Sequence, residues 1–275
     1  MIIIKDVLTE DLNPIGMTDN NMIGLSPSDR VGIMHIFGAP GQGKTFALAT
    51  MAISDIVHGR GGVLIDPYGD LADKILDHVP SDRKTKVVVF DLEEGDLASN
   101  IERFEKEIHL SEVRSDDQKF LLCKLHGMKL GEDVPCAFGQ YLLGKFFEVV
   151  GEDQNLSNRA LYLDEAYNYL DESNLDRVLQ SKSLGLRTVL SDQSKKGYIN
   201  ETLKQLAVAT DHLLSYKTDD ETQKFISENY HLDVSAEDIG ALEKYHHYAS
   251  LIVNGERQPT TIMQGVHPIP FPETK

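Results

Sequence analysis

The stretch Gly38–Thr45 has the residue types and the spacing needed to hold phosphate groups. It reads Gly38-Ala39-Pro40-Gly41-Gln42-Gly43-Lys44-Thr45, with Phe46 directly after it, and fits the pattern G-x-x-x-x-G-K-[ST]. Glycines let the backbone wrap closely around phosphates, so that successive N–H groups point at the anion. Lys44 can reach the β- and γ-phosphates, and the Thr45 hydroxyl can bind Mg²⁺. We therefore expect Gly38 to Phe46 to bind ATP, with Lys44 also catalytic and Thr45 a metal ligand.

A second candidate group is the acid pair Asp164-Glu165, which follows the apolar run Leu161-Tyr162-Leu163. ATP hydrolysis needs a carboxylate near Mg²⁺ at the end of a strand close to the phosphate loop, and Asp164 can supply it. It also needs a group that positions or activates the attacking water, and Glu165 is the natural candidate. Acids are common after strands, but a pair downstream of Gly38–Thr45 is much more specific. We expect Asp164 to be a metal ligand and Glu165 to be catalytic.

Polar residues after two other apolar runs are further candidates. Gln193 follows Thr188–Asp192 and is predicted to contact the γ-phosphate or the water and to report the nucleotide state; the alternative is an ordinary loop glutamine. Asp66 ends another run, at the strand edge where open α/β sheets place ligands. Asp70, four residues on, can equally begin or cap a helix. Site and structural roles remain open for these two acids.

Basic residues are candidates for contacts with a neighbouring subunit or with a polymer. An arginine from a neighbouring subunit often stabilises charge in phosphoryl transfer, and Arg159, Arg177 and Arg187 are the candidates. Each has an alternative role as a surface or salt-bridging residue. The pair Lys195-Lys196 could contact the phosphates of a polymer in a ring pore, although solvated loop lysines are more common.

The elements that must position these residues follow from an alternation of apolar runs and helical segments. This alternation predicts an α/β fold with a mainly parallel sheet flanked by helices, and the apolar runs suit strands covered on both faces. The predicted strands are Val31–Phe37, Gly62–Asp66, Val87–Asp91, Ala160–Asp164, Arg187–Ser191 and His212–Tyr216. The predicted helices are Lys44–His58, Gly69–Val79, Leu175–Ser183 and Asn200–Ala207.

Two segments stand apart from this alternation. Residues 92–158 begin with many acids and continue with amphipathic helical patterns around Asp116–Lys129 and Pro135–Val150. We expect 92–158 to be a mostly helical insertion on the sheet edge, within a single domain spanning 1–275. Near the C-terminus, Tyr248–Val253 and Thr260–Met263 predict a hairpin, with Asn254-Gly255 suited to a type I′ turn.

Composition limits the class of protein. The 275 residues, of which 41% are hydrophobic, can form one large α/β domain with a sizeable core. A formal net charge of −17 argues against nucleic-acid binding over the whole surface, although a few basic residues can still line a groove or pore. No apolar run approaches the roughly 20 residues of a membrane-spanning helix, and the start has no basic leader or small-residue cleavage site. Cys123 and Cys136 suggest neither a disulfide framework nor a metal site. We expect a cytoplasmic protein without a membrane span.

With these motifs placed, the chain resembles the HerA/FtsK superfamily of ring-forming DNA-motor ATPases. Within it, the likeness is to the coupling-protein ATPases of conjugation and type IV secretion and to related viral genome-packaging ATPases. Four stretches carry it: Gly38–Thr45, Gly62–Ala72, Leu161–Glu165 and Gly185–Gln193. The element Asp66-Pro67-Tyr68-Gly69-Asp70 is much more specific than the phosphate loop alone.

The resemblance implies a RecA-like P-loop NTPase core and a homohexameric ring. It also implies hydrolysis of Mg²⁺-ATP at subunit interfaces and movement of double-stranded DNA through the pore. It supports Lys44 and Thr45 as the nucleotide and Mg²⁺ contacts. It also supports Asp164 and Glu165 as the hydrolytic residues and Gln193 as the sensor.

The chain also departs from the family pattern. Tyr68 stands where relatives often have His, and Lys182 stands where an Arg is expected before Gly185. The insertion looks shorter than the helical domain of many coupling proteins, so a compact genome-packaging ATPase competes closely with a conjugation-type motor. A second hypothesis, favoured by the acidic charge, is an ATPase that powers protein secretion or assembly at a portal or secretion complex without binding DNA. A third, a P-loop kinase for small molecules, is disfavoured by Glu165 beside Asp164.

Overall fold

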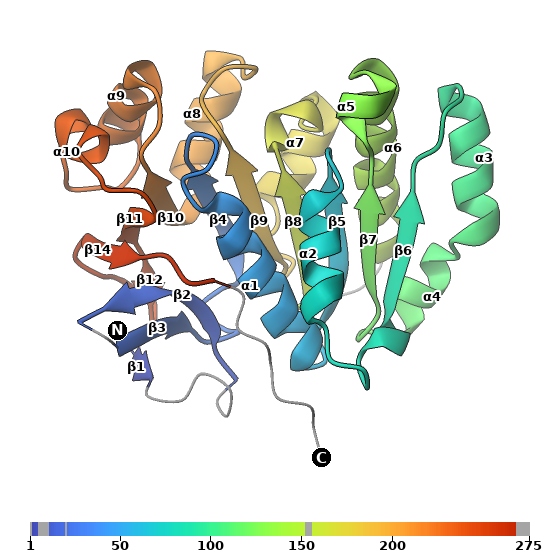
Figure 1. The fold of residues 1–275 in the computed structure, drawn as a ribbon, viewed down its shortest axis with the longest axis horizontal. Coiled ribbons are helices and arrows are strands. Elements are labelled where there is room, and N and C mark those ends of the chain that lie inside the picture. Colours follow the sequence, from blue (N-terminus) through green and yellow to red (C-terminus); the bar gives the residue numbers. More distant parts are fainter. Residues whose placement is uncertain (1, 5–10, 20, 152–155, 268–275) are drawn as a thin grey trace.

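One continuous sheet organises the computed structural model, which describes residues 2–4, 11–19, 21–151 and 156–267 (Figure 1). Twelve strands of these described residues pair in the order β1-β3-β2-β14-β11-β10-β4-β9-β8-β5-β7-β6. The run from β10 to β6 is parallel throughout. Its strands are β10 (Thr210–Tyr216), β4 (Gly32–Phe37), β9 (Arg187–Asp192), β8 (Arg159–Asp164), β5 (Gly61–Asp66), β7 (Phe120–Lys124) and β6 (Val87–Asp91). All six predicted strands are confirmed within this run.

The other part of the sheet is antiparallel. Its strands are β1 (Ile2–Ile4), β2 (Asn13–Thr18), β3 (Asn21–Leu25), β11 (His246–Ser250) and β14 (Thr261–Gln264). The predicted C-terminal hairpin is confirmed, since β11 pairs with β14 and a small ribbon, β12 (Ile252–Val253) with β13 (Glu256–Arg257), lies between them. Asn254 and Gly255 turn that ribbon with φ angles of 53° and 79°, the left-handed values that a type I′ turn requires. The strands β2 and β3 were not predicted.

Helices cover both faces of the sheet. On one face lie α1 (Lys44–Val57) and α2 (Asp70–His78), drawn in front in Figure 1. On the other face α6 (Asp133–Val150), α7 (Glu172–Leu179), α8 (Asn200–Ala209) and α9 (Asp220–Asn229) contribute buried side chains to a second core. The remaining elements are α3 (Leu97–Glu107), α4 (Leu110–Ser115), α5 (Gly127–Leu130), α10 (Ala236–Gly240) and the 3₁₀ turns η1 (Lys84–Lys86) and η2 (Ala166–Asn168).

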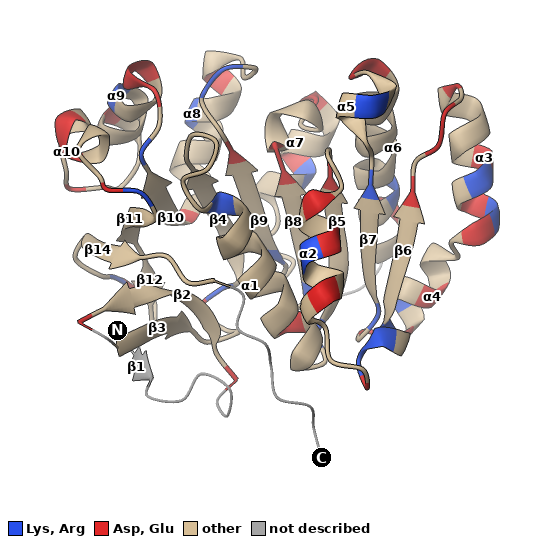
Figure 2. Cartoon of the chain, viewed as in Figure 1, with Lys and Arg blue, Asp and Glu red and all other residues tan. Residues whose placement is uncertain are grey.

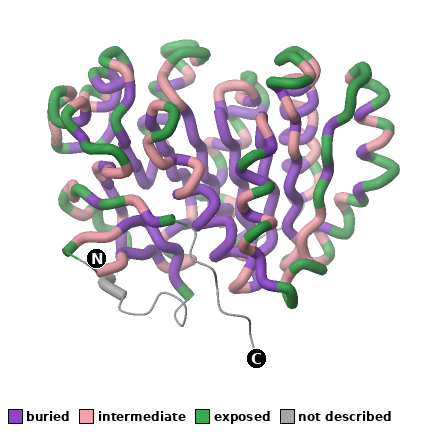
Figure 3. Tube along the Cα trace, in the orientation of Figure 1, coloured by how far each residue is buried: buried purple, intermediate pink, exposed green. Residues whose placement is uncertain are grey.

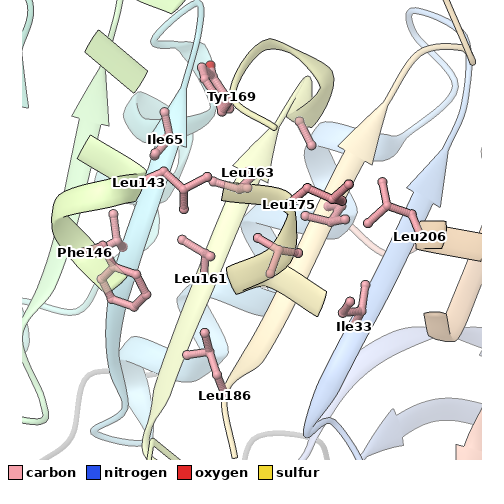
Figure 4. Close-up of a cluster of buried hydrophobic side chains, with 14 of the residues drawn as sticks. Ile33, Ile65, Leu143, Phe146, Leu161, Leu163, Tyr169, Leu175, Leu186 and Leu206 are labelled. Atoms are coloured by element: carbon pink, nitrogen blue, oxygen red, sulfur yellow. The ribbon is translucent and has the colours of Figure 1, made fainter. Parts of the chain in front are cut away.

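The apolar strands explain why the sheet is covered twice. Successive side chains of a strand point to opposite faces, so Ile33 and Phe37 of β4 belong to one core, whereas Met34 and Ile36 belong to the other. Figure 4 shows the core that contains Ile33, where Leu143 and other apolar side chains of α6, α7 and α8 pack against the strands. Strands β4, β5, β8, β9 and β10 are buried along their lengths, whereas many helices are exposed on their outer sides (Figure 3).

The segment 92–158 differs from its prediction in one respect. It is largely helical, with α3, α4, α5 and α6, and the helix expected at Pro135–Val150 is α6. The helix expected around Asp116–Lys129 is wrong, because this stretch contains strand β7. β7 lies between β5 and β6 and is buried from Phe120 to Cys123, so the segment is not merely an addition at the sheet edge but supplies an interior strand.

The charged residues are distributed unevenly over this fold. Four of the parallel strands end in an aspartate: Asp66 on β5, Asp91 on β6, Asp164 on β8 and Asp192 on β9 (Figure 2). Because the carboxyl ends of parallel strands meet at one edge of the sheet, the fold concentrates acids there. No helix of the described residues has the length and apolarity needed to cross a membrane.

Candidate nucleotide site

The loop between β4 and α1 lies at the carboxyl edge of the parallel strands and is held in place by the backbone. The Gly38 N–H donates to the Asp192 carbonyl (3.1 Å), and the Ala39 N–H donates to the Lys217 carbonyl (2.8 Å). These bonds tie the loop to the strand ends on both sides of β4. Gly41 and Gly43 have φ angles of 75° and 124°, which residues with a side chain rarely adopt. The glycines of the motif are therefore needed for this loop conformation.

The first turn of α1 is prepared for an anion. Gly43 caps the helix, and neither a side-chain cap nor an acidic residue is present in its first turn. The N-terminus of a helix carries partial positive charge and N–H groups without an internal partner, which favours phosphate. Lys44 is 7% exposed, and its ammonium donates to the Gly38 carbonyl at 2.6 Å. This bond holds the lysine over the loop, where it can contact a phosphate.

A cavity of about 290 Å³ opens beside this loop. The predicted residues that line it come from the loop and from the ends of β5, β8 and β9: Ala39, Pro40, Gly41, Gly43, Lys44, Thr45, Phe46, Asp66, Asp70, Asp164, Glu165 and Gln193. Gly38 and Gln42 of the predicted motif are not among its lining residues. The structure thus brings together residues that are more than 100 positions apart in the sequence.

The cavity is strongly acidic, and the pKa values of its groups reflect this. Burial, together with the neighbouring Asp66 and Glu165, raises the pKa of Asp164 to about 7. Burial and the charge of Asp192 also raise the pKa of Glu165. Burial lowers the pKa of Lys44, although the surrounding carboxylates oppose this effect. Four acids and two lysines line the cavity, and the excess of negative charge is one that a bound cation would neutralise.

The oxygen groups at the cavity suit Mg²⁺. This ion prefers oxygen ligands and is usually held by one or two carboxylates together with substrate phosphates. Asp164 and the Thr45 hydroxyl, which both line the cavity, are such ligands. The described residues contain no cluster of three or more His, Cys, Asp or Glu that would form an all-protein metal site. The donor set therefore fits a metal that arrives with a nucleotide.

Glu165 and Gln193 lie next to each other, as their predicted roles require. Glu165 is 3% exposed and has φ 50° and ψ 58°, a left-handed conformation that is costly for a residue with a side chain. Its Oε2 accepts a hydrogen bond from the Gln193 N–H at 3.4 Å. The Gln193 carbonyl in turn accepts from the Thr218 hydroxyl at 2.9 Å. The end of β9 thus restrains the carboxylate of Glu165.

Asp66 has a structural role at the edge of the cavity. Its buried carboxylate accepts hydrogen bonds from the N–H groups of Tyr68 (3.0 Å), Gly69 (2.8 Å) and Ala72 (2.9 Å). These bonds fix the turn that follows β5 and the start of α2. Asp70 is the first residue of α2, whose N-cap is Gly69. Asp70 therefore begins the helix, as one of its two predicted structural roles required, but it does not cap it, and Asp66 accepts from the first turn instead.

Two of the three candidate arginines are unsuited to act on a neighbouring subunit. Arg159 and Arg187 begin β8 and β9, at the end of the sheet opposite the cavity, and are only 4% and 0% exposed. Arg177 on α7 is half-buried and donates to the Gly144 carbonyl at 2.9 Å. In the loop after β9, the ammonium of Lys195 lies 3.6 Å from Glu221, and Lys196 is exposed.

Two lining residues, Lys244 and Tyr245, were missed by the sequence analysis. They precede β11 and reach the cavity because β11 pairs with β10 beside the loop strand β4. Tyr245 has a φ of 66°, and the Lys244 ammonium lies 4.8 Å from the centre of its ring. No motif marks this pair, and only the topology of the sheet shows its place.

Comparison with known proteins supports this picture at the level of fold. No family model matches the chain, and no curated protein matches it in sequence.

Solved structures do match the fold of this chain. The genome-packaging NTPase B204 of Sulfolobus turreted icosahedral virus 2, in complex with ATP-gammaS, is 15% identical with a TM-score of 0.55, covering 86% of this chain and 98% of B204. The bacterial conjugative coupling protein TrwB is 12% identical with a TM-score of 0.63, over 95% and 90% of the two chains. VirB4 of Thermoanaerobacter pseudethanolicus is 11% identical with a TM-score of 0.66, over 94% and 97%.

The chain shares its fold with these three proteins. The predicted RecA-like core, a mainly parallel sheet flanked by helices, is therefore confirmed, and so is the predicted likeness to packaging and coupling proteins. Within this fold the chain keeps the loop of Gly38–Thr45 and the acid pair Asp164-Glu165 at the same edge of the sheet.

Proposed function

We propose that this chain hydrolyses ATP with Mg²⁺ and uses the energy to move double-stranded DNA as a ring of identical subunits. The observation that carries the hydrolysis is the meeting of Lys44, Asp164, Glu165 and Gln193 around one acidic cavity beside a phosphate loop. The movement of DNA is supported by the fold shared with a genome-packaging NTPase and a conjugative coupling protein.

The residues act on ATP in defined places. Loop N–H groups and the Lys44 ammonium bind the β- and γ-phosphates, which lie at the start of α1. The Thr45 hydroxyl and Asp164 would hold Mg²⁺, which would neutralise phosphate charge when bound. Glu165 accepts a proton from the attacking water while the oxygen of that water bonds to the γ-phosphorus. The bond from that phosphorus to the β–γ bridging oxygen breaks, and ADP and phosphate leave.

The contact of Gln193 with Glu165 supports the proposed sensor role of Gln193. Its backbone N–H meets the carboxylate of Glu165, while the residue also lines the cavity. A change at the γ-phosphate would therefore reach the loop after β9 through Gln193. That loop carries Lys195 and Lys196, which we propose as contacts to DNA phosphates in the pore.

The cellular setting belongs to the same proposal. We propose a homohexamer in the cytoplasm, which is consistent with the two free thiols, Cys123 and Cys136. A protein at a portal or secretion complex is the proposed docking partner.

One alternative load is favoured by a specific observation. The net charge of −17 disfavours close approach to a polyanion over most of the surface. An ATPase that powers protein secretion or assembly without DNA would have no such conflict.

The ATPase rate measured with and without double-stranded DNA separates these two loads. The assay is run at several low salt concentrations, because phosphate contacts weaken as salt rises. Glu165→Gln serves as the blank for contaminating ATPases. A DNA motor predicts stimulation by DNA that the variant lacks. Equal rates with and without DNA would favour the protein-moving alternative, and electron microscopy with ATP tests the ring itself.

A further inference from the structure

The aspartate that ends β9 is the centre of a buried hydrogen-bond network beside the cavity. Asp192 is 0% exposed. Its Oδ2 accepts from His35 Nε2 (2.7 Å) and from the Tyr198 hydroxyl (2.7 Å), and its Oδ1 accepts from the Tyr167 N–H (3.2 Å). A buried carboxylate is costly unless it is well supplied with donors, and here both oxygens have them.

His35 connects this carboxylate to a more distant part of the chain. It lies on β4, three residues before Gly38, and is fully buried. Its Nδ1 lies 2.8 Å from the hydroxyl of Tyr230, which follows α9. With Asp192 ionised, Nε2–H donates to the carboxylate, and Nδ1 accepts from Tyr230. Asp192, His35 and Tyr230 then each have a hydrogen-bond partner, and the ring orientation of His35 is fixed.

The network meets the backbone at the turn that carries Glu165. Glu165 is left-handed, and such a conformation persists only when its surroundings hold it. Tyr167, two residues later, donates its N–H to Asp192. Gln193, the residue after Asp192, donates its N–H to the Glu165 carboxylate. Asp192 therefore restrains the turn after Glu165. It also lies next to Gln193, which restrains the side chain of Glu165.

We propose that Asp192, oriented by His35 and Tyr198, is a positioning residue that fixes the Glu165 carboxylate for hydrolysis. This inference rests on the ATP hydrolysis proposed above. Asp192 does not line the cavity and would not touch ATP, so it acts only through Glu165 and its turn. The network also links Glu165 to β4 and to the segment after α9.

The test compares Asp192→Asn with the wild-type chain in steady-state ATP hydrolysis. Asparagine offers an acceptor to only one of the two sides of Asp192. Its oxygen should face His35 and Tyr198, which are two donors, so that Tyr167 loses its partner. A small displacement of a catalytic group can cost about 100-fold in rate. We expect kcat to fall about 10- to 100-fold, whereas the KM for ATP changes less than about threefold. Hydrogen exchange adds a readout independent of activity, and the Tyr167 amide should exchange faster in the variant.

Milder variants keep the test decisive where Asp192→Asn does not fold. Tyr198→Phe removes one donor to Asp192, and Tyr162→Phe is its matched control. Tyr162 likewise donates from a hydroxyl to a buried aspartate, Asp55 (2.5 Å), which pairs with Arg30 and Arg60 and does not line the cavity. Of these two variants, only Tyr198→Phe should lower kcat. His35→Leu should lower it further, and His35→Gln, which retains a donor and an acceptor, should restore part of it.

Several results would overturn the inference. One is an unchanged kcat in both Asp192→Asn and Tyr198→Phe. Another is an equal loss of kcat in Tyr198→Phe and Tyr162→Phe, which would show general destabilisation. A KM that rises as much as kcat falls would point to nucleotide binding instead. A wild-type chain that binds ATP but does not hydrolyse it would refute the proposed function first, before any variant is compared.

Discussion

Replacement of Lys44 gives the sharpest view of how the loop binds nucleotide. Lys44→Met keeps the length and the apolar stem of the side chain and removes only the ammonium. Lys44 is buried, and its ammonium donates to the Gly38 carbonyl at 2.6 Å. In this buried position a hydrogen bond from a charged group to phosphate is worth about 1.5–3 kcal/mol. Since 1.4 kcal/mol is tenfold in affinity, the Kd for ATP should rise about 10- to 100-fold.

The assay is isothermal titration of each chain with ATPγS and Mg²⁺, so that hydrolysis does not disturb the equilibrium. Lys224→Met is the matched control, because Lys224 lies on α9 with a 72% exposed side chain. It loses the same charge at a distance from the cavity and should bind as the wild type does. A Kd for Lys44→Met within about twofold of the wild type would refute the assignment of this loop as the phosphate site.

Three further predictions follow from the same geometry. Gln193→Ala should lower kcat at least about tenfold with little change in ATP affinity, as measured by parallel turnover and binding assays. Chelation of Mg²⁺ with EDTA should remove the thermal stabilisation given by ATP, which should be about 2.7 kcal/mol at 100 times the Kd. Asp55→Asn should lower the free energy of unfolding by about 3–5 kcal/mol at pH 7 in urea titrations, because the buried guanidinium groups of Arg30 and Arg60 lose their partner. Although burial opposes it, the charges of Arg30, Arg187 and Arg60 hold the pKa of Asp55 well below its usual value. Its contribution is therefore present above pH about 4 and lost as pH falls further, so the difference between wild type and Asp55→Asn should shrink at pH 2 to 3.

The sequence predicted the part of the fold in which local patterns are strong. The strand, glycine loop and helix around Gly38–Thr45 follow from residue types alone, since φ angles such as that of Gly43 require glycine. The end of β8 could be recognised because two acids follow an unbroken apolar run. In each case the chemistry and the secondary structure are encoded in neighbouring residues.

The strand β7 was missed because its apolar run is short. Phe120–Lys124 is flanked by charged residues, and over so few positions a buried strand and a buried helix segment have the same hydrophobic pattern. Its identity is decided by pairing with β5 and β6, which are distant in sequence. The same holds for Lys244 and Tyr245, whose place at the cavity depends on the pairing of β11 with β10.

The arginines show a different limit of sequence reasoning. Residue type made Arg159 and Arg187 candidates for a neighbouring site, but their positions at the starts of β8 and β9 place them at the opposite end of the sheet. Arg187 lies near the buried Asp55, whose charge partly opposes the lowering of its pKa by burial. The role of such a residue depends on which end of its strand it occupies and what lies around it.

Glu165→Gln tests the central claim, that this cavity binds and hydrolyses ATP, most directly. The variant keeps the size of the side chain and removes its ability to accept a proton from water. ATP affinity and single-turnover hydrolysis are measured on the same preparations of variant and wild type. If Glu165 activates the water, Glu165→Gln should bind ATP with an affinity within about threefold of the wild type and hydrolyse it at least about 100-fold more slowly. Hydrolysis by Glu165→Gln at the wild-type rate would contradict this claim.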